Sequence, residues 1–212
     1  HDPHEIEMLS TKREQQEKLP GVKLPDNIAI EADLETALTD EDVVVMAVPS
    51  PVVRTVAKQM SPFVKDGQII VNVAKGIEDV TYKTLSDIIE EEIPNAEVCV
   101  LSGPSHAEEV GIGIPTTVVI GAKNKKTAEM LQDVFMNKVF RVYTSSDIIG
   151  IELGGALKNV IALAAGTVDG LGYGDNTKAA LMTRGIAELT RLGEAMGGKP
   201  ETFSGLTGVG DL

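Results

Sequence analysis

The feature that most constrains the fold is a change in the pattern of apolar residues near Ser145. Before Ser145, short apolar runs such as residues 42–48 (DVVVMAV) alternate with stretches of helical period. A continuous apolar run of that length is typical of a strand that is buried on both faces of a sheet. After Ser145, the strand signals stop and two long helical stretches follow. The sequence therefore predicts an α/β domain that is followed by a helical domain.

The first part of the chain alternates between expected strands and expected helices, which predicts a mostly parallel sheet with helices on both faces. The expected strands are residues 27–31, 42–48, 68–73, 97–101, 116–120 and 139–143, and the expected helices are 3–18, 34–38, 51–60, 81–92 and 125–136. The second part has expected helices at 148–167 and 177–196, joined by the glycine-rich turn 169–175. The expected domain bounds are 1–147 for the α/β domain and 148–212 for the helical domain.

Composition narrows the range of partners. The chain has a net charge of −13, three Tyr, four Phe and no Trp. Proteins that read nucleic acids rely on basic surfaces and stacking aromatic rings, so no nucleic-acid partner is expected. The apolar stretch 153–168 is short for a membrane span and carries Lys158 at its centre, which favours a soluble core helix and no stable membrane insertion. A phosphorylated substrate remains compatible, because it needs only local positive charge.

The cysteine count and the start of the chain bear on location. Cys99 is the only cysteine, so an intrachain disulfide is impossible, as suits a reducing compartment. Residues 1–18 are polar and show no signal peptide, and the first residue is His rather than Met. We predict a cytoplasmic location. No histidine–cysteine cluster has the spacing of a metal site, so no metal is predicted.

Lys158 is the most informative single residue. It is the only charged side chain between Leu153 and Val168, and lysine is rarely buried without a partner or a task. Gly154 lies four residues earlier on the same helix face, so a ligand could approach the backbone beside the ammonium group. The alternative is a lysine that extends from a buried helix to the surface. The helix pattern alone favours neither interpretation.

Three expected strands are followed by residues that suit ligand binding. These residues are Pro49 and Ser50, then Lys75 and Gly76, then the segment 103–105. In open α/β sheets, ligands bind beyond the carboxyl ends of the strands, which favours a functional interpretation. For Lys75 the plain alternative is an exposed loop lysine.

Two of these segments also have a purely structural explanation. Ser50 followed by Pro51 is a common start of a helix, with Ser50 as the N-cap. Ser105 and Glu108 have the spacing of a capping box, and the same helix terminus would offer free N–H groups to an anion. The usual dinucleotide fingerprint, Gly-x-Gly-x-x-Gly after a strand, is missing from the chain, as are a P-loop and a Gly-x-Ser-x-Gly elbow.

Five segments, taken in order, resemble the bacterial-type NAD(P)-dependent glycerol-3-phosphate dehydrogenases. They are residues 47–50 (AVPS), 74–78 (AKGIE), 102–110 (SGPSHAEEV), 152–185 (ELGGALKNVIALAAGTVDGLGYGDNTKAALMTRG) and 205–212 (GLTGVGDL). The resemblance implies a Rossmann-like doubly wound sheet domain followed by an all-helical domain. It also implies a hydride transfer with NAD or NADP that interconverts dihydroxyacetone phosphate and sn-glycerol 3-phosphate. This reaction would supply glycerol phosphate for phospholipid synthesis.

The resemblance also assigns roles to individual residues. Lys158 matches the family's proton-transferring lysine and would be the catalytic residue. The residues implied to contact the substrate are Lys75, Gly103, Ser105, Lys158, Asn159 and Asp211. The residues implied to contact the cofactor are His1, Pro49, Lys75 and Ala107.

The chain also departs from the family, whose members begin earlier, with a glycine-rich turn, and continue beyond the segment that ends at residue 212. We therefore expect this chain on its own to be inactive or nearly so, and a longer protein that contains it to be active. The alternatives are a β-hydroxyacid-type dehydrogenase and a non-catalytic module of the same fold. Intact Lys75, Lys158 and Asp211 favour an enzyme. The choice between NAD and NADP stays open, and the helices leave room for a homodimer.

Overall fold

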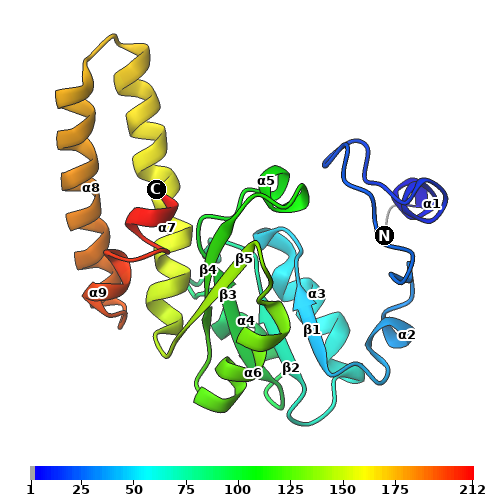
Figure 1. Cartoon of the computed structure of the whole chain (residues 1–212). Helices are drawn as coiled ribbons and strands as arrows, with labels where there is room; N and C mark the ends of the chain where they lie inside the picture. Colours follow the sequence, from blue (N-terminus) through cyan, green and yellow to red (C-terminus); the bar gives the residue numbers. More distant parts are fainter. Residues whose placement is uncertain (1–2) are drawn as a thin grey trace.

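A five-stranded sheet forms the centre of the molecule (Figure 1). The computed structural model describes residues 3–212. The strands lie side by side in chain order, and all neighbours are parallel except β3 and β4, which are antiparallel. Their bounds are β1 Val43–Met46, β2 Ile69–Asn72, β3 Glu97–Ser102, β4 Thr116–Gly121 and β5 Phe140–Ser145.

Helices connect the strands and then continue alone after β5. The α-helices are α1 Pro3–Lys12, α2 Leu34–Leu38, α3 Val53–Met60, α4 Leu85–Glu92, α5 Ala107–Gly111, α6 Lys125–Phe135, α7 Ile148–Gly170, α8 Asp175–Ala195 and α9 Pro200–Phe203. The 3₁₀ turns are η1 Ser50–Val52, η2 Ser61–Phe63 and η3 Val209–Asp211. The long helices α7 and α8 pack side by side at one end of the sheet (Figure 1).

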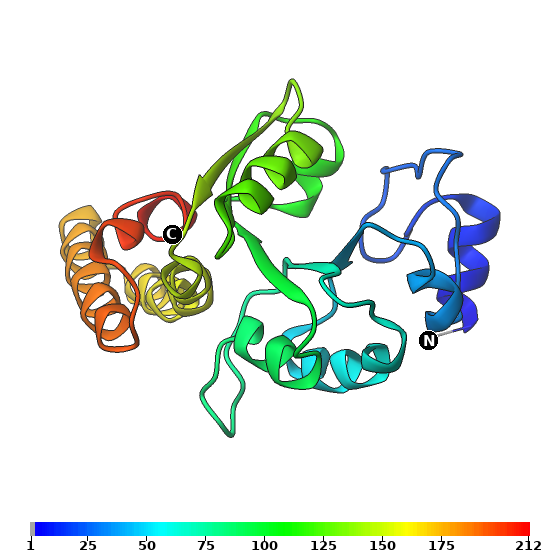
Figure 2. The same ribbon diagram turned by 90° about the horizontal axis from the view of Figure 1, so that it is seen from below.

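The sheet is covered on both faces, as the alternation of strands and helices predicted. Ile70 and Val98 point to one face, where they pack with residues of α2, α3 and α4. Val71 and Cys99, each one position further along its strand, belong to the cluster on the other face, which includes Leu131 of α6. Successive side chains of a strand alternate between faces, so this division follows from the strand geometry. Figure 2 shows the helices on the two sides of the sheet.

Helix α7 belongs to two layers of packing. Its N-cap Asp147 accepts a hydrogen bond from Gly150 N, and Ile148 and Ile151 pack on Val100 of the sheet. Leu153 instead joins the cluster formed with α8 and α9. By length and composition α7 is apolar enough to cross a membrane, a test that core helices of soluble proteins also pass. Because α7 packs on both parts, the domain division after residue 147 remains a prediction.

Three expected elements differ from the structure by four residues or more. Residues 27–31 form no strand. The first helix ends at Lys12 rather than at residue 18, because Arg13 takes a positive φ of 53°, which a helix cannot continue through. Helix α4 begins at Leu85 rather than at residue 81. Tyr82 has a φ of 57° and Thr84 caps the helix by accepting a hydrogen bond from Asp87 N.

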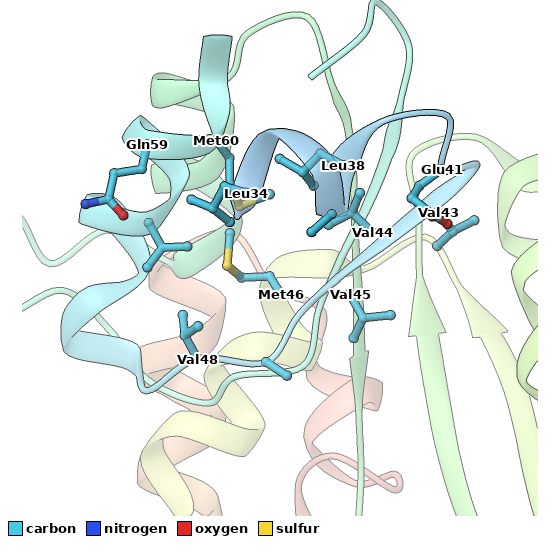
Figure 3. Close-up of a pocket in the computed structure, with 13 residues that line it drawn as sticks. Leu34, Leu38, Glu41, Val43, Val44, Val45, Met46, Val48, Gln59 and Met60 are labelled. Atoms are coloured by element: carbon cyan, nitrogen blue, oxygen red, sulfur yellow. The ribbon is translucent and has the colours of Figure 1, made fainter. Parts of the chain in front are cut away.

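An apolar groove of about 400 Å³ lies beside β1, the strand at the edge of the sheet (Figure 3). Side chains of α2, β1 and α3 line it, among them Leu34, Val44 and Met60. Val45 on the edge strand is 45% exposed. None of the residues that line the groove belongs to the cluster of charged residues described next.

Candidate functional site

The loops that follow β1, β2 and β3 meet at one edge of the sheet. These strands are parallel neighbours, so their carboxyl ends lie together. Gly76, after β2, has a φ of 154°, and a Cβ at this position would lie 2.6 Å from Cβ of Ser50, after β1. Glycine at position 76 therefore allows the first two loops to touch. This contact places Lys75 at the carboxyl edge, as the position of the residue in the sequence predicted.

Lys75 extends from this loop to two oxygen atoms. Its Nζ lies 2.9 Å from the carbonyl oxygen of Gly103, after β3, and 2.6 Å from Oδ2 of Asp211 in η3. Burial lowers the pKa of the Lys75 ammonium group, Asp211 opposes that shift, and nearby Lys158 adds to it. Lys75 is therefore a partly buried cation with fixed partners rather than an exposed loop lysine.

Lys158 contacts the other oxygen atom of the same carboxylate. Its Nζ lies 2.5 Å from Oδ1 of Asp211, and its side chain is 17% exposed. The carboxylate of Asp211 itself is only 4% exposed. The interpretation of Lys158 as a lysine that extends to the surface is therefore wrong. One buried carboxylate joins an ammonium group from the sheet domain to one from α7.

Two glycines allow α7 to lie close to its neighbours. A Cβ at Gly154 would collide with the carbonyl oxygen of Thr207, and a Cβ at Gly155 would lie 2.9 Å from Oγ of Ser102. The expectation that a ligand approaches the backbone at Gly154 is wrong, because the Thr207 carbonyl occupies that place. The hydroxyl of Ser102 is buried and has no hydrogen-bond partner among residues 3–212.

The expected helix caps are also wrong. Ser105 does not cap a helix: its Oγ donates to the carbonyl oxygen of Gly103, at 3.1 Å, and α5 begins after His106. Ser105 is thereby held beside the oxygen that Lys75 contacts. Ser50 makes no capping hydrogen bond either, since it is the first residue of η1 and Pro49 takes the N-cap position without a side-chain bond.

The remaining predicted residues lie outside the hydrogen-bonded cluster. Pro49, Ala107 and Asn159 are exposed, and within residues 3–212 their side chains have no hydrogen bond to Lys75, Lys158 or Asp211. His1 lies outside the described residues. In the described part of the chain, no three His, Cys, Asp or Glu side chains gather as metal ligands.

Sequence reasoning did not single out Glu152, Asn72 or Ser86. All three are buried and join α7 to the sheet domain through hydrogen bonds. A signal was present for two of them: Asn72 is a polar residue inside the apolar run 68–73, and Glu152 is an acidic residue at the start of an apolar helix.

The fold and this junction place the chain in the class of two-domain proteins that join a Rossmann-like sheet domain to a helical domain. Within that class, the chain belongs to the NAD-dependent glycerol-3-phosphate dehydrogenase family. Residues 1–128 match the family model of the N-terminus and residues 147–212 match that of the C-terminus.

Named relatives agree with this family. The chain is 64% identical to glycerol-3-phosphate dehydrogenase [NAD(P)+] of Agathobacter rectalis, over 98% of this chain and 62% of the relative. It is 59% identical to the Fusobacterium nucleatum protein of the same name, over 100% of this chain and 64% of the relative. The crystal structure of glycerol-3-phosphate dehydrogenase from Coxiella burnetii superimposes with a TM-score of 0.94 at 33% identity, over 100% of this chain and 65% of that chain. The chain therefore spans slightly less than two thirds of the length of these relatives.

Proposed function

We propose that the protein containing this chain interconverts dihydroxyacetone phosphate and sn-glycerol 3-phosphate with NAD(H) or NADP(H). The observation that carries this proposal is the sharing of the Asp211 carboxylate by Lys75 and Lys158, at 2.6 and 2.5 Å. Reduction of a ketone needs a proton donor at the carbonyl oxygen and a group that fixes the carbonyl. A pair of ammonium groups in fixed positions supplies both.

Lys158 is the proton donor in this proposal. Its Nζ gives a proton to the substrate carbonyl oxygen as that oxygen gains negative charge, and it takes the proton back when the alcohol is oxidised. Asp211 holds the ammonium group in place through Oδ1. A proton that passes from a positioned group contributes about 10² to 10⁴ in rate.

Lys75 binds and orients the substrate. Two ammonium groups face one carboxylate at this junction, so the cluster has a net charge of +1 in a chain whose net charge is −13. Such local positive charge attracts an anionic substrate despite the acidic surface. Gly103 and Ser105, which lie beside Lys75, and Asn159, next to Lys158, are proposed to complete the substrate contacts.

The carboxyl edge of the sheet fits the nicotinamide end of the cofactor. Dinucleotides lie across this edge in doubly wound sheets, and the loops after β1, β2 and β3 converge there. Pro49, Lys75 and Ala107 would hold the cofactor, with His1 beyond the described residues. When bound, NADH or NADPH supplies the hydride that the carbonyl carbon accepts.

The wider biology is proposed from the same activity. We propose a cytoplasmic enzyme that supplies glycerol phosphate for phospholipid synthesis, acts as a homodimer, and has no nucleic-acid partner and no membrane insertion. We also propose that the helical domain of this enzyme begins at residue 148.

The experiment uses the full-length protein that contains these residues. Oxidation of NADH and of NADPH is followed with dihydroxyacetone phosphate for the wild type, Lys158→Ala and Lys125→Ala. Lys125 is an exposed lysine on α6 and serves as the control. We expect Lys158→Ala to lower kcat by at least about a hundredfold at unchanged cofactor affinity, while Lys125→Ala keeps the wild-type rate.

Two results would count against this function. A folded wild-type protein that is inert with both cofactors would contradict the proposed reaction. Activity with hydroxyacids alone would show that the proposed substrate class is wrong. If Lys158→Ala kept the wild-type rate, the proposed reaction would stand, but Lys158 could not be its proton donor.

A further inference from the structure

Glu152 is a buried acidic residue that the proposed mechanism does not use. It lies on α7, six residues before Lys158, and is 5% exposed. Burial raises the pKa of its carboxyl group, and hydrogen bonds from Ser86 oppose that shift. Burial of a carboxylate is costly unless hydrogen-bond donors surround it. The donors that surround Glu152 therefore show which parts of the fold it connects.

The partners of Glu152 come from two elements of the sheet domain. Its Oε1 accepts hydrogen bonds from Ser86 N, at 2.9 Å, and from Nδ2 of Asn72, at 3.4 Å, and its Oε2 accepts from the Ser86 hydroxyl. Ser86 lies in the first turn of α4, where the free N–H groups favour a negative charge. These bonds fix α7 against both α4 and the end of β2.

Asn72 continues the connection to the loop that carries Lys75. It is the last residue of β2 and is fully buried. Its Oδ1 accepts a hydrogen bond from Ala74 N, at 3.1 Å, and its Nδ2 donates to the carbonyl oxygen of Ala74, at 3.2 Å. Ala74 directly precedes Lys75, so the Asn72 amide holds the backbone from which the Lys75 side chain extends.

We infer that Glu152 and Asn72 are positioning residues that set the Lys75 ammonium group against Lys158. Glu152 lies on the helix that carries Lys158, and Asn72 holds the loop that carries Lys75. The hydrogen bond between their side chains, called the tie below, therefore joins α7 directly to the loop that carries Lys75. This inference rests on the proposed function, since it assigns the two lysines to one reaction site.

The inference predicts losses of activity from residues that do not reach the substrate. A displacement of a reacting group by about 1 Å can cost about a hundredfold in rate. We expect Glu152→Ala and Asn72→Ala each to lower kcat/KM for dihydroxyacetone phosphate by at least about tenfold. Because both act through one tie, the double variant should lose about as much activity as the more impaired of the two single variants, a non-additive result.

Two further variants separate positioning from simple stability. Glu152→Gln keeps an acceptor oxygen for Ser86 N and Asn72, and its amide can donate to the Ser86 hydroxyl, so it should retain kcat/KM within about threefold. Ile151→Val trims a fully buried neighbour of Glu152 on the same helix without touching the tie. It should lower the melting temperature and leave kcat and KM unchanged.

The assays use the full-length protein at a temperature where circular dichroism shows every variant to be folded. The inference is overturned if Glu152→Ala and Asn72→Ala match Ile151→Val in kcat and KM, because the tie then supports only the fold. Full additivity of the two losses, or a Glu152→Gln variant as impaired as Glu152→Ala, would overturn it as well.

A second measurement decides the inference without any turnover. The rate of reductive methylation of Lys75 is compared by mass spectrometry with that of exposed Lys125. Release of Lys75 from Asp211 and Gly103 should raise its relative rate severalfold in Asn72→Ala and Glu152→Ala, and an unchanged rate contradicts the tie. If the wild type is inert while Lys75 labelling responds as expected, the proposed reaction fails and the positioning tie stands.

Discussion

At the scale of single residues, Glu78 shows how one ion pair holds the loop of Lys75 from its other side. Arg54 on α3 contacts both carboxylate oxygens of Glu78, with Nε at 2.6 Å from Oε1 and Nη2 at 2.8 Å from Oε2. This fork geometry is the strong form of an arginine–carboxylate pair. The Arg54 guanidinium lowers the pKa of Glu78 from its usual 4.5 to about 2, and a hydrogen bond from Thr81 adds to the shift.

The lowered pKa predicts a pH dependence of stability. Between about pH 4.5 and pH 2 the unfolded chain binds more protons at Glu78 than the folded chain does, so its contribution is present above pH 4.5 and is lost as the pH falls toward 2. Glu78→Gln should therefore melt at a lower temperature than the wild type at pH 7, and the difference should shrink as the pH is lowered from about 5 to about 3. The melting temperatures of both proteins, measured by thermal unfolding across this pH series, test the prediction. Glu108→Gln, on exposed α5, is the control, and a difference for Glu78→Gln that stays constant with pH would contradict the prediction.

The candidate site was partly visible in the sequence, and its residues show why. Lys158 stood out as a lone charge on an apolar helix, and Lys75 stood out because it follows an expected strand, whereas Asp211 was identified only from the family resemblance. Glu152 could not be connected to anything, since its partners Ser86 and Asn72 lie 66 and 80 residues away. Ser105 and Glu108 had the spacing of a capping box, yet the Ser105 hydroxyl donates to the carbonyl oxygen of Gly103, two residues earlier, and α5 begins only after His106.

At the scale of elements, strong sequence patterns predicted the type and the position of each helix or strand better than its first and last residues. The short helix at 34–38 was predicted with its observed bounds, and in the structure Asp33 caps it by accepting a hydrogen bond from Thr36 N. The buried strands were found as apolar runs, but β1 and β2 are shorter than those runs. The start of α4 was missed because Tyr82 adopts a left-handed conformation that its sequence does not signal.

Two helical glycines make a matched pair for testing how α8 packs. A Cβ at Gly193 of α8 would overlap the ring of Phe203, which is fully buried, so Gly193→Ala must displace that ring. Gly166 of α7 is exposed and faces open space, so Gly166→Ala gains only helix propensity, worth about 0.5 to 1 kcal/mol. We expect Gly193→Ala to lower the free energy of unfolding by at least about 1 kcal/mol and Gly166→Ala to raise it. Urea denaturation measures both, and an equal gain at the two positions would show that Phe203 does not pack as described.

At the scale of the whole molecule, α7 makes the sheet and the helices depend on each other. One turn of this helix presents Ile151 to the sheet and Leu153 to the cluster of α8 and α9. A packing defect on either side therefore loosens the same helix. The two parts should unfold in one cooperative transition rather than separately.

A substitution at Ile151 tests this cooperativity. Ile151→Ala removes a fully buried side chain and should cost about 2 to 5 kcal/mol. Native-state hydrogen exchange should then show the same loss of protection in β3 and in α8. Leu163→Ala, on the exposed outer half of α7, should leave both elements unchanged. Faster exchange in one element alone after Ile151→Ala would show that the two parts are independent.

Among residues 3–212, the edge strand β1 pairs with another strand on one side only, which has a consequence for how this chain behaves in solution. Its outer backbone groups are available to another strand, and exposed Val45 adds an apolar contact, which is the usual route of edge-to-edge aggregation. Repulsion between copies that each have a net charge of −13 opposes that association. Dissolved salt screens the repulsion but leaves the strand edge unchanged. We therefore expect the colloidal stability of the 212-residue chain to be greatest in dilute buffer and to fall as ionic strength rises.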